Sequence, residues 1–337
     1  MTGPPEPDEG GNMPRTMKAL AGAVLLAALA SLAGEALAQS YPTRAVRIIV
    51  PFAAGGRVDG LARIVANSLS EQLGQPFVVE SRAGAGGSAG SDFVAKSAGD
   101  GYTLLLASAG THAILPVIDR NLPYDPVRDF TPIANLVEGY TFIGAHPSLG
   151  ATNLADLVRI ARERPDSIGF ATSGIGTYGH FAGELLKSSL GINLEHVPYR
   201  GSGPAMNDLI AGHVPLMIAG ELVDLARAGR IRAIATTNER RSPELPDVPT
   251  IGESGMAPIT VHSWIALVGP AGIPPEIVER INAAVGRAIN DPRNLPQLQT
   301  LGVSPSFSTA AALGTRIATD RATYADIVRR ANLRFEQ

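Results

Sequence analysis

The stretch from Arg47 to Ala62 reads RIIVPFAAGGRVDGLA and indicates how this chain folds. Its β-branched apolar run predicts a buried strand, Gly55 and Gly56 predict a turn, and the residues after them are typical of an amphipathic helix. A strand–turn–helix junction points backbone N–H groups and the positive end of the helix dipole at whatever lies above the strand. The stretch therefore predicts an anion-binding turn.

Strand and helix patterns alternate along the chain. The first strands are expected at 46–50, 77–80 and 102–107, with helices at 61–73 and 92–97, and this order indicates an α/β fold with a mostly parallel sheet. The alternation resumes with strands at 142–145, 168–171, 193–197, 216–219, 232–236 and 263–268, and helices at 154–163, 180–189, 204–211, 275–290 and 310–330. About 300 residues follow residue 38, more than one core usually organises, so a hinged clamshell of two lobes is predicted.

The N-terminal segment is typical of an export signal. Arg15 and Lys18 precede an apolar run from 19 to about 33, and Ala36-Leu37-Ala38 is the small-x-small pattern of a signal-peptidase site. We expect cleavage after Ala38 and a periplasmic mature protein. A retained membrane anchor is the weaker alternative, because a bilayer span needs about 20 apolar residues. Translation starting at Met13 or Met17 stays open, since the first twelve residues suit no signal peptide.

Composition excludes several classes of protein. Residues 1–38 carry two basic and four acidic side chains, so the net charge of −3 becomes −1 after cleavage, and no basic field for nucleic acid remains. The absence of cysteine removes disulfides and thiol chemistry. No H-E-x-x-H motif and no hydrolase triad are visible in the sequence, so we expect no catalytic residues, no metal and no cofactor.

Glycine-rich segments follow several of the predicted strands. In open α/β sheets ligands bind at the carboxyl ends of strands, where helix N-termini converge. A cleft between the two lobes is therefore expected to collect the segments Ala53–Asp59, Ala83–Gly90, Ser108–His112, Ser173–His180 and Tyr199–Pro204.

Other interpretations of these segments stay open. Gly174–Gly179 matches the dinucleotide pattern G-x-G-x-x-G, but Glu195 falls inside a predicted strand, and a structural turn is the second alternative. Asp59 suits the N-cap of a helix that starts at Gly60. Arg57 and Arg200 suit a ligand carboxylate, and equally suit solvated loop positions.

Motifs spread over the chain carry a family resemblance. They are Tyr41-Pro42, Val50–Gly56 with Asp59, Gly84–Gly87, Asp100–Leu105, Leu122–Pro126 with Asp129-Phe130, His180 with Gly183–Leu185, His196–Gly201 and Arg241–Thr250. In this order they make the chain, from Tyr41 to about Arg330, resemble the Bug-type, TctC-like extracytoplasmic solute receptors of tripartite tricarboxylate transporters. Two departures stand out: Ala219-Gly220 replaces a position that offers an acid in some relatives, and Arg57 replaces a small or neutral residue.

The resemblance implies a two-lobed periplasmic-binding-protein fold of type II-like architecture, with two crossing strands joining the lobes. It implies a first lobe of residues 39–140 plus 264–337 and a second lobe of residues 141–263. Between them it implies a carboxylate held mainly by backbone N–H groups and hydroxyls. The implied contacts are Phe52, Ala53, Gly55, Gly56, Arg57, Asp59, Gly86, Gly87, Ser108, Thr111, His112, Ser173, Gly174, Gly176, Thr177, Pro198, Tyr199, Arg200 and Gly201.

We therefore expect a monomeric, non-enzymatic receptor that captures a di- or tricarboxylate or an aromatic acid and delivers it to the membrane subunits of a tripartite tricarboxylate transporter. A sensory receptor for a membrane kinase and a periplasmic enzyme on the same fold are the alternatives. Because Ala219-Gly220 offers no acid to pair an ammonium, an amine-free carboxylate is the expected ligand, although Glu221 lies next to it.

The export signal can be tested directly. N-terminal sequencing of the periplasmic fraction should give a chain that begins near Gln39, because the small residues at 36 and 38 fit the peptidase. A chain that keeps Met1 or Met13 in the membrane fraction would contradict this prediction.

Overall fold

The computed structural model describes residue 3, residues 41–256 and residues 261–335. Residues 1–43 and residues 44–337 form separate units, and the fold below is that of the second. Apart from residue 3, the predicted export signal lies outside the described residues. None of the described helices combines the length and the apolar character that a membrane crossing needs.

The first lobe is built on a six-stranded sheet of order β11-β4-β10-β3-β1-β2. Its strands are β1 (Val46–Val50), β2 (Phe77–Ser81), β3 (Thr103–Ser108), β4 (Phe130–Gly139), β10 (Ser263–Pro270) and β11 (Val303–Pro305). Its helices are α2 (Arg57–Leu73), α3 (Ser88–Ala95), α4 (Leu115–Ile118), α9 (Pro275–Asn290), α10 (Leu295–Thr300) and α11 (Ala310–Arg330), with short turns η1 (Ala85–Gly87) and η2 (Gly110–Ile114). Helices α9 and α11 pack on β4, and every residue of β3 and β10 is buried.

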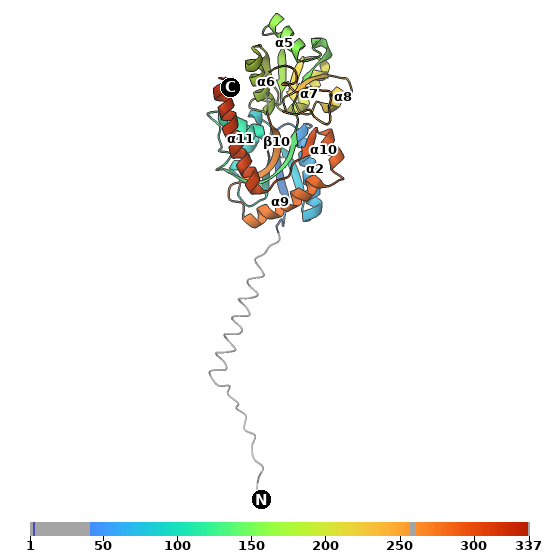
Figure 1. The fold of residues 1–337 in the computed structure, drawn as a ribbon. Helices are drawn as coiled ribbons and strands as arrows, with labels where there is room; N and C mark the ends of the chain where they lie inside the picture. The colour runs from blue at the N-terminus through green and yellow to red at the C-terminus, as the bar shows by residue number, and fades with distance from the viewer. Residues whose placement is uncertain (1–2, 4–40, 257–260, 336–337) are drawn as a thin grey trace. The chain divides into compact units, whose positions relative to one another are not determined.

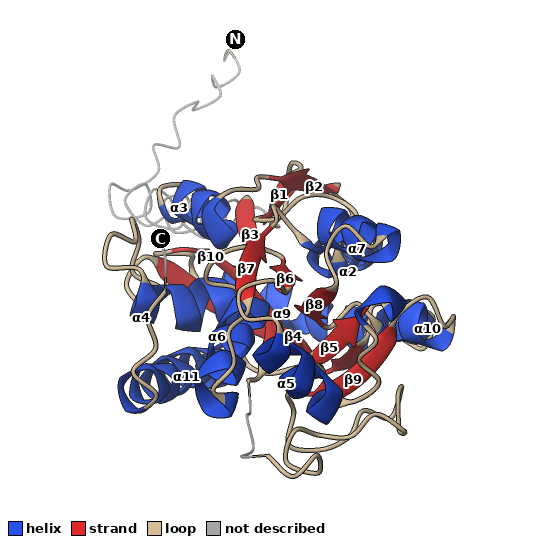
Figure 2. Cartoon of the chain, turned by 90° about the horizontal axis from the view of Figure 1, so that it is seen from above, coloured by secondary structure: helices blue, strands red, loops and turns tan. Residues whose placement is uncertain are grey.

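The second lobe is built on a five-stranded sheet of order β7-β6-β8-β5-β9. Its strands are β5 (Phe142–Ala145), β6 (Gly169–Thr172), β7 (Glu195–Pro198), β8 (Leu216–Ala219) and β9 (Arg232–Thr236). Its helices are α5 (Leu154–Glu163), α6 (Tyr178–Leu190), α7 (Ser202–Ala211) and α8 (Val223–Arg227), with the turn η3 (Pro147–Leu149). Figure 1 shows α5 to α8 gathered around one sheet and α2, α9 and α10 around the other, and Figure 2 shows helices flanking the strands. The fold is two-lobed and α/β, as predicted.

Both sheets are mixed. Parallel pairing occurs within the two stretches where strands and helices alternate: β1 pairs with β2 and β3, and β6 pairs with β7 and β8. The other pairs, β10 with β3 and β4, β11 with β4, and β5 with β8 and β9, are antiparallel. The expectation of mostly parallel sheets therefore holds only for the βαβ parts, because strands that leave for the other lobe and return run in opposite directions.

Two antiparallel segments carry the chain between the lobes. Strand β4 continues into β5, and the chain returns after β9 into β10, whose Ser263 pairs with Gly139 of β4. Between the sheets, the hydroxyl of Thr236 and the backbone N–H of Thr237 each donate to the Thr141 carbonyl at 2.9 Å. These bonds tie the outgoing segment to the returning one.

Helix α11 runs beside the crossing strands and reaches the second lobe. Buried Trp264 of β10 donates its indole N–H to Asp320 at 2.7 Å. Beyond the helix, the Phe335 ring stacks on Phe181 of α6 with centroids 5.9 Å apart, and Ser188 donates to the Ala331 carbonyl at 3.2 Å. The described residues 331–335 accordingly lie beside α6 (Figure 1), so the C-terminal part of lobe I contacts lobe II.

Most element positions agree with the sequence patterns, and the bounds of β5, α5, β8, β9, α9 and α11 agree residue for residue. Strand β4 was not expected, because Pro132 and Asn135 interrupt its apolar pattern. Pro132 lies beside a register shift against β10, where a missing donor is tolerated, and buried Asn135 donates its side-chain amide to the Ser306 carbonyl at 2.7 Å. Both features depend on segments far away in sequence.

Candidate functional site

Four helices begin where the two lobes face each other. Their N-caps are Gly56 of α2, Gly87 of α3, Thr177 of α6 and Gly201 of α7, and none of these residues supplies a side-chain cap. Elsewhere, Asn153 and Thr309 cap α5 and α11 with their own side chains. Ser88, the first residue of α3, donates its backbone N–H to the Ala85 carbonyl. The helix ends otherwise carry no side-chain cap, so first-turn N–H groups can serve an anion, which the positive ends of the helix dipoles favour.

The inner cavity lies between these helix ends and has a volume of about 20 Å³. The sequence-predicted site residues that line it are Phe52, Ala53, Asp59, Ser108, Ser173 and Thr177, and the sequence interpretation missed Val58, Tyr178, Ser202, Glu221 and Ile265. Its walls come from both lobes. This volume holds about one water molecule, so a larger molecule requires the lobes to separate.

The outer cavity adjoins the inner one at Phe52 and Ser173 and has a volume of about 180 Å³. Among the predicted site residues it is lined by Phe52, Gly86, Gly87, Ser173, Gly174, Pro198, Tyr199 and Arg200, and it adds Gly84, Ala85 and Ile175. The Ser173 hydroxyl has no hydrogen-bond partner among the described residues. The outer cavity thus combines glycine turns, one unengaged hydroxyl and the exposed Arg200.

Direct contacts across the cleft hold the lobes together in this conformation. The Ala53 backbone N–H of the first lobe donates to the Arg200 carbonyl of the second at 3.0 Å. Gly86, with φ +63°, lies so close to the Ile175 carbonyl that any side chain at Gly86 would overlap it. Near the outer cavity, the backbone of the first lobe therefore lies directly against the backbone of the second lobe.

Several predicted site residues line neither cavity. Thr111 and His112 are fully buried, and His112 packs against Phe130 at 4.6 Å and Tyr124 at 6.0 Å between ring centroids. Burial lowers the pKa of His112 to about 3, so the imidazole is a neutral core group. The other residues outside the linings are Gly55, Gly56, Arg57, Gly176 and Gly201.

Arg57 lies at the crossing strands instead of in the cleft. Its side chain is 2% exposed, and its guanidinium donates to the Ser263 hydroxyl at 3.3 Å and the Tyr140 carbonyl at 3.4 Å. A side chain at Gly220 would overlap this guanidinium. Arg57 is therefore neither a solvated loop residue nor a lining residue, and it joins α2 to both crossing segments.

Asp59 is engaged within its own helix. Helix α2 begins at Arg57, so Asp59 lies in the first turn and is not the N-cap of a helix starting at Gly60. Its carboxylate accepts hydrogen bonds from the Gly55 backbone N–H at 3.2 Å and from Nε and Nη2 of Arg63 at 3.0 and 3.2 Å. This pairing compensates the negative charge that Asp59 brings to the inner cavity.

Glu221 is a functional candidate that the sequence analysis mentioned beside Ala219-Gly220 but did not include among the site residues. It lies two residues after the end of β8, and its carboxylate accepts from the Ser202 hydroxyl at 2.5 Å and the Gly220 backbone N–H at 3.1 Å. The Tyr178 hydroxyl lies 3.4 Å away; burial, and then the charge of Glu221, raise the pKa of Tyr178, so it stays a donor. A position at the carboxyl end of a strand was the signal that could have identified Glu221.

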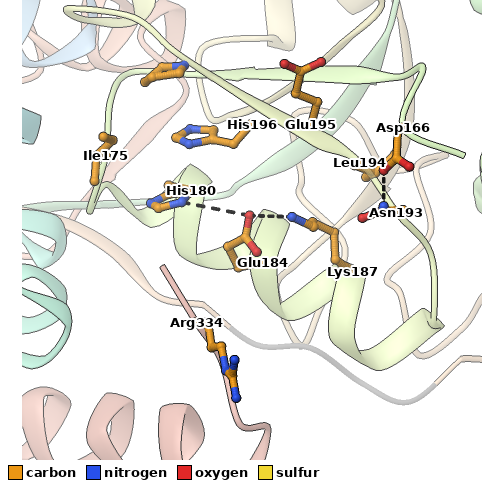
Figure 3. A pocket seen from close by; sticks show the side chains of 11 residues that line it. Asp166, Ile175, His180, Glu184, Lys187, Asn193, Leu194, Glu195, His196 and Arg334 are labelled. Atoms are coloured by element: carbon orange, nitrogen blue, oxygen red, sulfur yellow. Dashed lines mark hydrogen bonds and ion pairs between the residues drawn. The ribbon is translucent and has the colours of Figure 1, made fainter. Parts of the chain in front are cut away.

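A third cavity of about 750 Å³ lies on the other side of the Ser173–Thr177 loop (Figure 3). His180 and His196 stack there with ring centroids 3.9 Å apart, and burial is the main cause that lowers their pKa values to about 3 and about 4. The Gly176 backbone N–H donates to Nδ1 of His180 at 3.0 Å. Neutral His180 therefore supports the loop from behind and does not reach the inner cavity.

The glycines that resemble a dinucleotide fingerprint have a packing explanation. Gly179 lies in the first turn of α6, where a side chain would overlap the Ile218 carbonyl of β8. Such close helix–strand approach is one function that glycine has in nucleotide folds, and it needs no nucleotide. In the described ranges, no group of three His, Cys, Asp or Glu side chains is placed to bind a metal ion.

A family model described as the tripartite tricarboxylate transporter family receptor, TctC, matches residues 61–333. Among curated proteins, the UPF0065 protein in the tcbD-tcbE intergenic region of Pseudomonas sp. (strain P51) is 38% identical over 293 residues, which is 85% of each chain. Protein BugT of Bordetella pertussis is 33% identical over 312 residues, covering 92% of this chain and 96% of BugT.

Solved structures match at similar identity. The R. palustris protein solved with adipate superposes with a TM-score of 0.84 at 34% identity, covering 88% of this chain and 99% of the other. MatC from Rhodopseudomonas palustris, solved with bound malate, gives 0.81 at 31% identity, covering 86% of this chain and all of MatC.

The buried neutral His112 predicts a pH-dependent stability. Because its pKa is about 3 in the folded protein and 6.5 ordinarily, the folded state binds fewer protons between those values. The full stability is present above pH 6.5 and is lost as the pH falls towards 3. His112→Phe should make the unfolding free energy from urea titrations less steep between pH 6.5 and 4, by up to about 1.4 kcal/mol per pH unit.

The exposed His262 provides the control. His262→Gln should leave the slope of the parent protein unchanged. An equal slope in the parent and in His112→Phe would show that the pKa of His112 is not lowered in the folded state.

Proposed function

Since the chain belongs to the tripartite tricarboxylate transporter receptor family, we propose that it is a periplasmic receptor that closes two lobes over a small carboxylate and delivers it to the membrane subunits of such a transporter. The observation that carries this proposal is that four helix N-termini without side-chain caps converge on the inner and outer cavities. These helix ends offer backbone donors of both lobes to one anion.

The outer cavity is the proposed place of the carboxylate. Its lining supplies the glycine turn Gly84–Gly87, the unengaged hydroxyl of Ser173 and the side chain of Arg200. Backbone N–H groups and one hydroxyl bind an anion without a buried ion pair, so the desolvation cost of a second charge is avoided. The adipate and malate bound by two structural relatives support a carboxylate as the ligand of this chain.

Closure is the proposed coupling between binding and delivery. The inner cavity of about 20 Å³ is too small for a four-carbon acid, so the ligand enters an open form and contacts from both lobes then favour the closed one. The predicted boundaries, with residues 39–140 and 264–337 in lobe I and residues 141–263 in lobe II, place the hinge at the crossing strands.

The carboxylates that line the inner cavity support binding over catalysis. Asp59 and Glu221 face it from different lobes, but Asp59 is paired with Arg63. Glu221 accepts hydrogen bonds from protein donors, and neither acid is hydrogen-bonded to a histidine in the described part of the chain. Within the described residues, the lining of the inner cavity therefore lacks the serine–histidine pair of a hydrolase triad.

Thermal unfolding against a panel of acids tests the function. The panel should include adipate, malate, a tricarboxylate and an aromatic acid, each with its uncharged amide as the matched control. A ligand at 100 times its Kd adds about 2.7 kcal/mol to the unfolding free energy, which raises the melting temperature. We expect a rise with at least one acid and none with its amide; a rise with the amides alone would refute a carboxylate receptor.

The backbone contact at Gly86 provides a test of closure. Gly86→Ala should obstruct closure, because its methyl group would overlap the Ile175 carbonyl, and should weaken binding of the best acid at least tenfold. Small-angle scattering should then show no decrease in the radius of gyration at an acid concentration that compacts the parent protein.

Gly74→Ala is the matched control for this variant. Gly74 has a similar φ of +73°, but nothing lies within 4 Å of a side chain there, so only the conformational strain of about 1 kcal/mol is shared. Gly74→Ala should bind and compact as the parent does. Normal binding and compaction by Gly86→Ala would contradict the closure mechanism.

A further inference from the structure

The inner cavity carries a negative charge that no ion pair within the described ranges compensates. Glu221 and Asp59 are the acids in its lining, and Asp59 is neutralised by Arg63. Glu221 accepts hydrogen bonds from Ser202, Gly220 and Tyr178, but no lysine, arginine or histidine within the described part of the chain forms an ion pair with it. A carboxylate has about four acceptor positions, so one position remains for a ligand.

Glu221 lies where a ligand that is bound in the outer cavity can reach it. Ser173 and Phe52 line both cavities, so an acid held in the outer cavity extends its next carbon atoms past these residues towards Glu221. The buried guanidinium of Arg57 lies against Gly220, the residue before Glu221, and Arg57 lines neither cavity. A ligand group next to Glu221 therefore meets a carboxylate and the Ser202 and Tyr178 hydroxyls that donate to it.

The chemistry of that group follows from the acceptor it meets. A second carboxylate would place two negative charges together in a cavity with room for about one water molecule, whereas a hydroxyl or an ammonium would donate a hydrogen bond to the carboxylate. An unsubstituted methylene would leave the remaining acceptor position of Glu221 without a partner on closure.

We propose that Glu221 is a specificity-determining residue, which selects acids that carry a hydrogen-bond donor, a hydroxyl or an ammonium, next to the carboxylate. The inference rests on the proposed carboxylate-receptor function and narrows its ligand class. It replaces the sequence-based expectation of an amine-free ligand, which relied on Ala219-Gly220 and did not place the side chain of Glu221 in the cleft.

Calorimetric titration with matched acids tests the inference. Succinate, malate and aspartate share four carbons and differ only in the hydrogen, hydroxyl or ammonium at carbon 2, and the analogous five- and six-carbon sets extend the series. The wild-type protein should bind the hydroxy or amino acid of its preferred length at least about tenfold tighter than the unsubstituted one, as a charged-acceptor hydrogen bond implies. Malate and aspartate then distinguish the hydroxyl from the ammonium.

Glu221→Gln should reduce this preference to about onefold, because the neutral amide no longer offers a charged acceptor to the hydroxyl or ammonium at carbon 2. Glu239→Gln, at an exposed glutamate of the same lobe, removes the same charge outside the cavities and should keep the wild-type ratio. Thermal unfolding of both variants establishes that they are folded.

The possible failures are distinguishable. If no acid of any length binds the wild-type protein, the receptor function falls and this inference with it. If unsubstituted acids bind as tightly as their hydroxy and amino derivatives, or if Glu221→Gln keeps the preference, the inference alone is overturned, whether or not the variant is destabilised.

Discussion

The antiparallel pairing of β4 and β10 is the constraint on which the rest of the structure depends. These strands belong to the core of the first sheet, and their continuations carry the chain to the second sheet and back. Ser263 pairs with Gly139 at the exit, and the Thr141 carbonyl accepts hydrogen bonds from Thr236 and Thr237 beyond it. Because both connections run side by side, the carboxyl ends of the strands in the two sheets face one cleft.

Backbone N–H groups are the main hydrogen-bond donors in this cleft, and most charged side chains around it have partners within the protein. The uncapped helix ends supply partial positive charge without the desolvation cost of a buried cation. Arg57, the cation nearest to them in sequence, is withdrawn to the crossing strands, where it bonds to Ser263 and Tyr140. Asp59 is paired with Arg63. Glu221 is left as the acid that presents an acceptor to the inner cavity.

The loop from Ser173 to Thr177 is held from two sides. In front, Ile175 lies against Gly86 of the first lobe. Behind, His180 accepts the Gly176 N–H, and the Thr172 hydroxyl lies 2.7 Å from Nε2 of His196. The ring of Phe335 contacts the ring of His180 edge-on, with centroids 5.3 Å apart. The segment after α11 therefore packs on the histidine that holds this loop. A rigid loop keeps its donors aligned, which lowers the entropic cost of binding.

The sequence by itself determined the local features: the strand–turn–helix junctions, the α/β alternation and the bounds of elements such as α5 and α9, because apolar periodicity and glycine turns depend on neighbouring residues. It also identified the segments that line the cleft, since strand ends in α/β folds are where ligands bind. Only the tertiary structure decided that β4 is a strand, that His112 is a core residue and that Arg57 lies at the crossing. It alone brought Glu221 beside Ser202 and Tyr178. These outcomes depend on partners outside the local pattern, since Ser263 lies 206 residues from Arg57, and Tyr178 and Ser202 lie 43 and 19 residues from Glu221 on other elements.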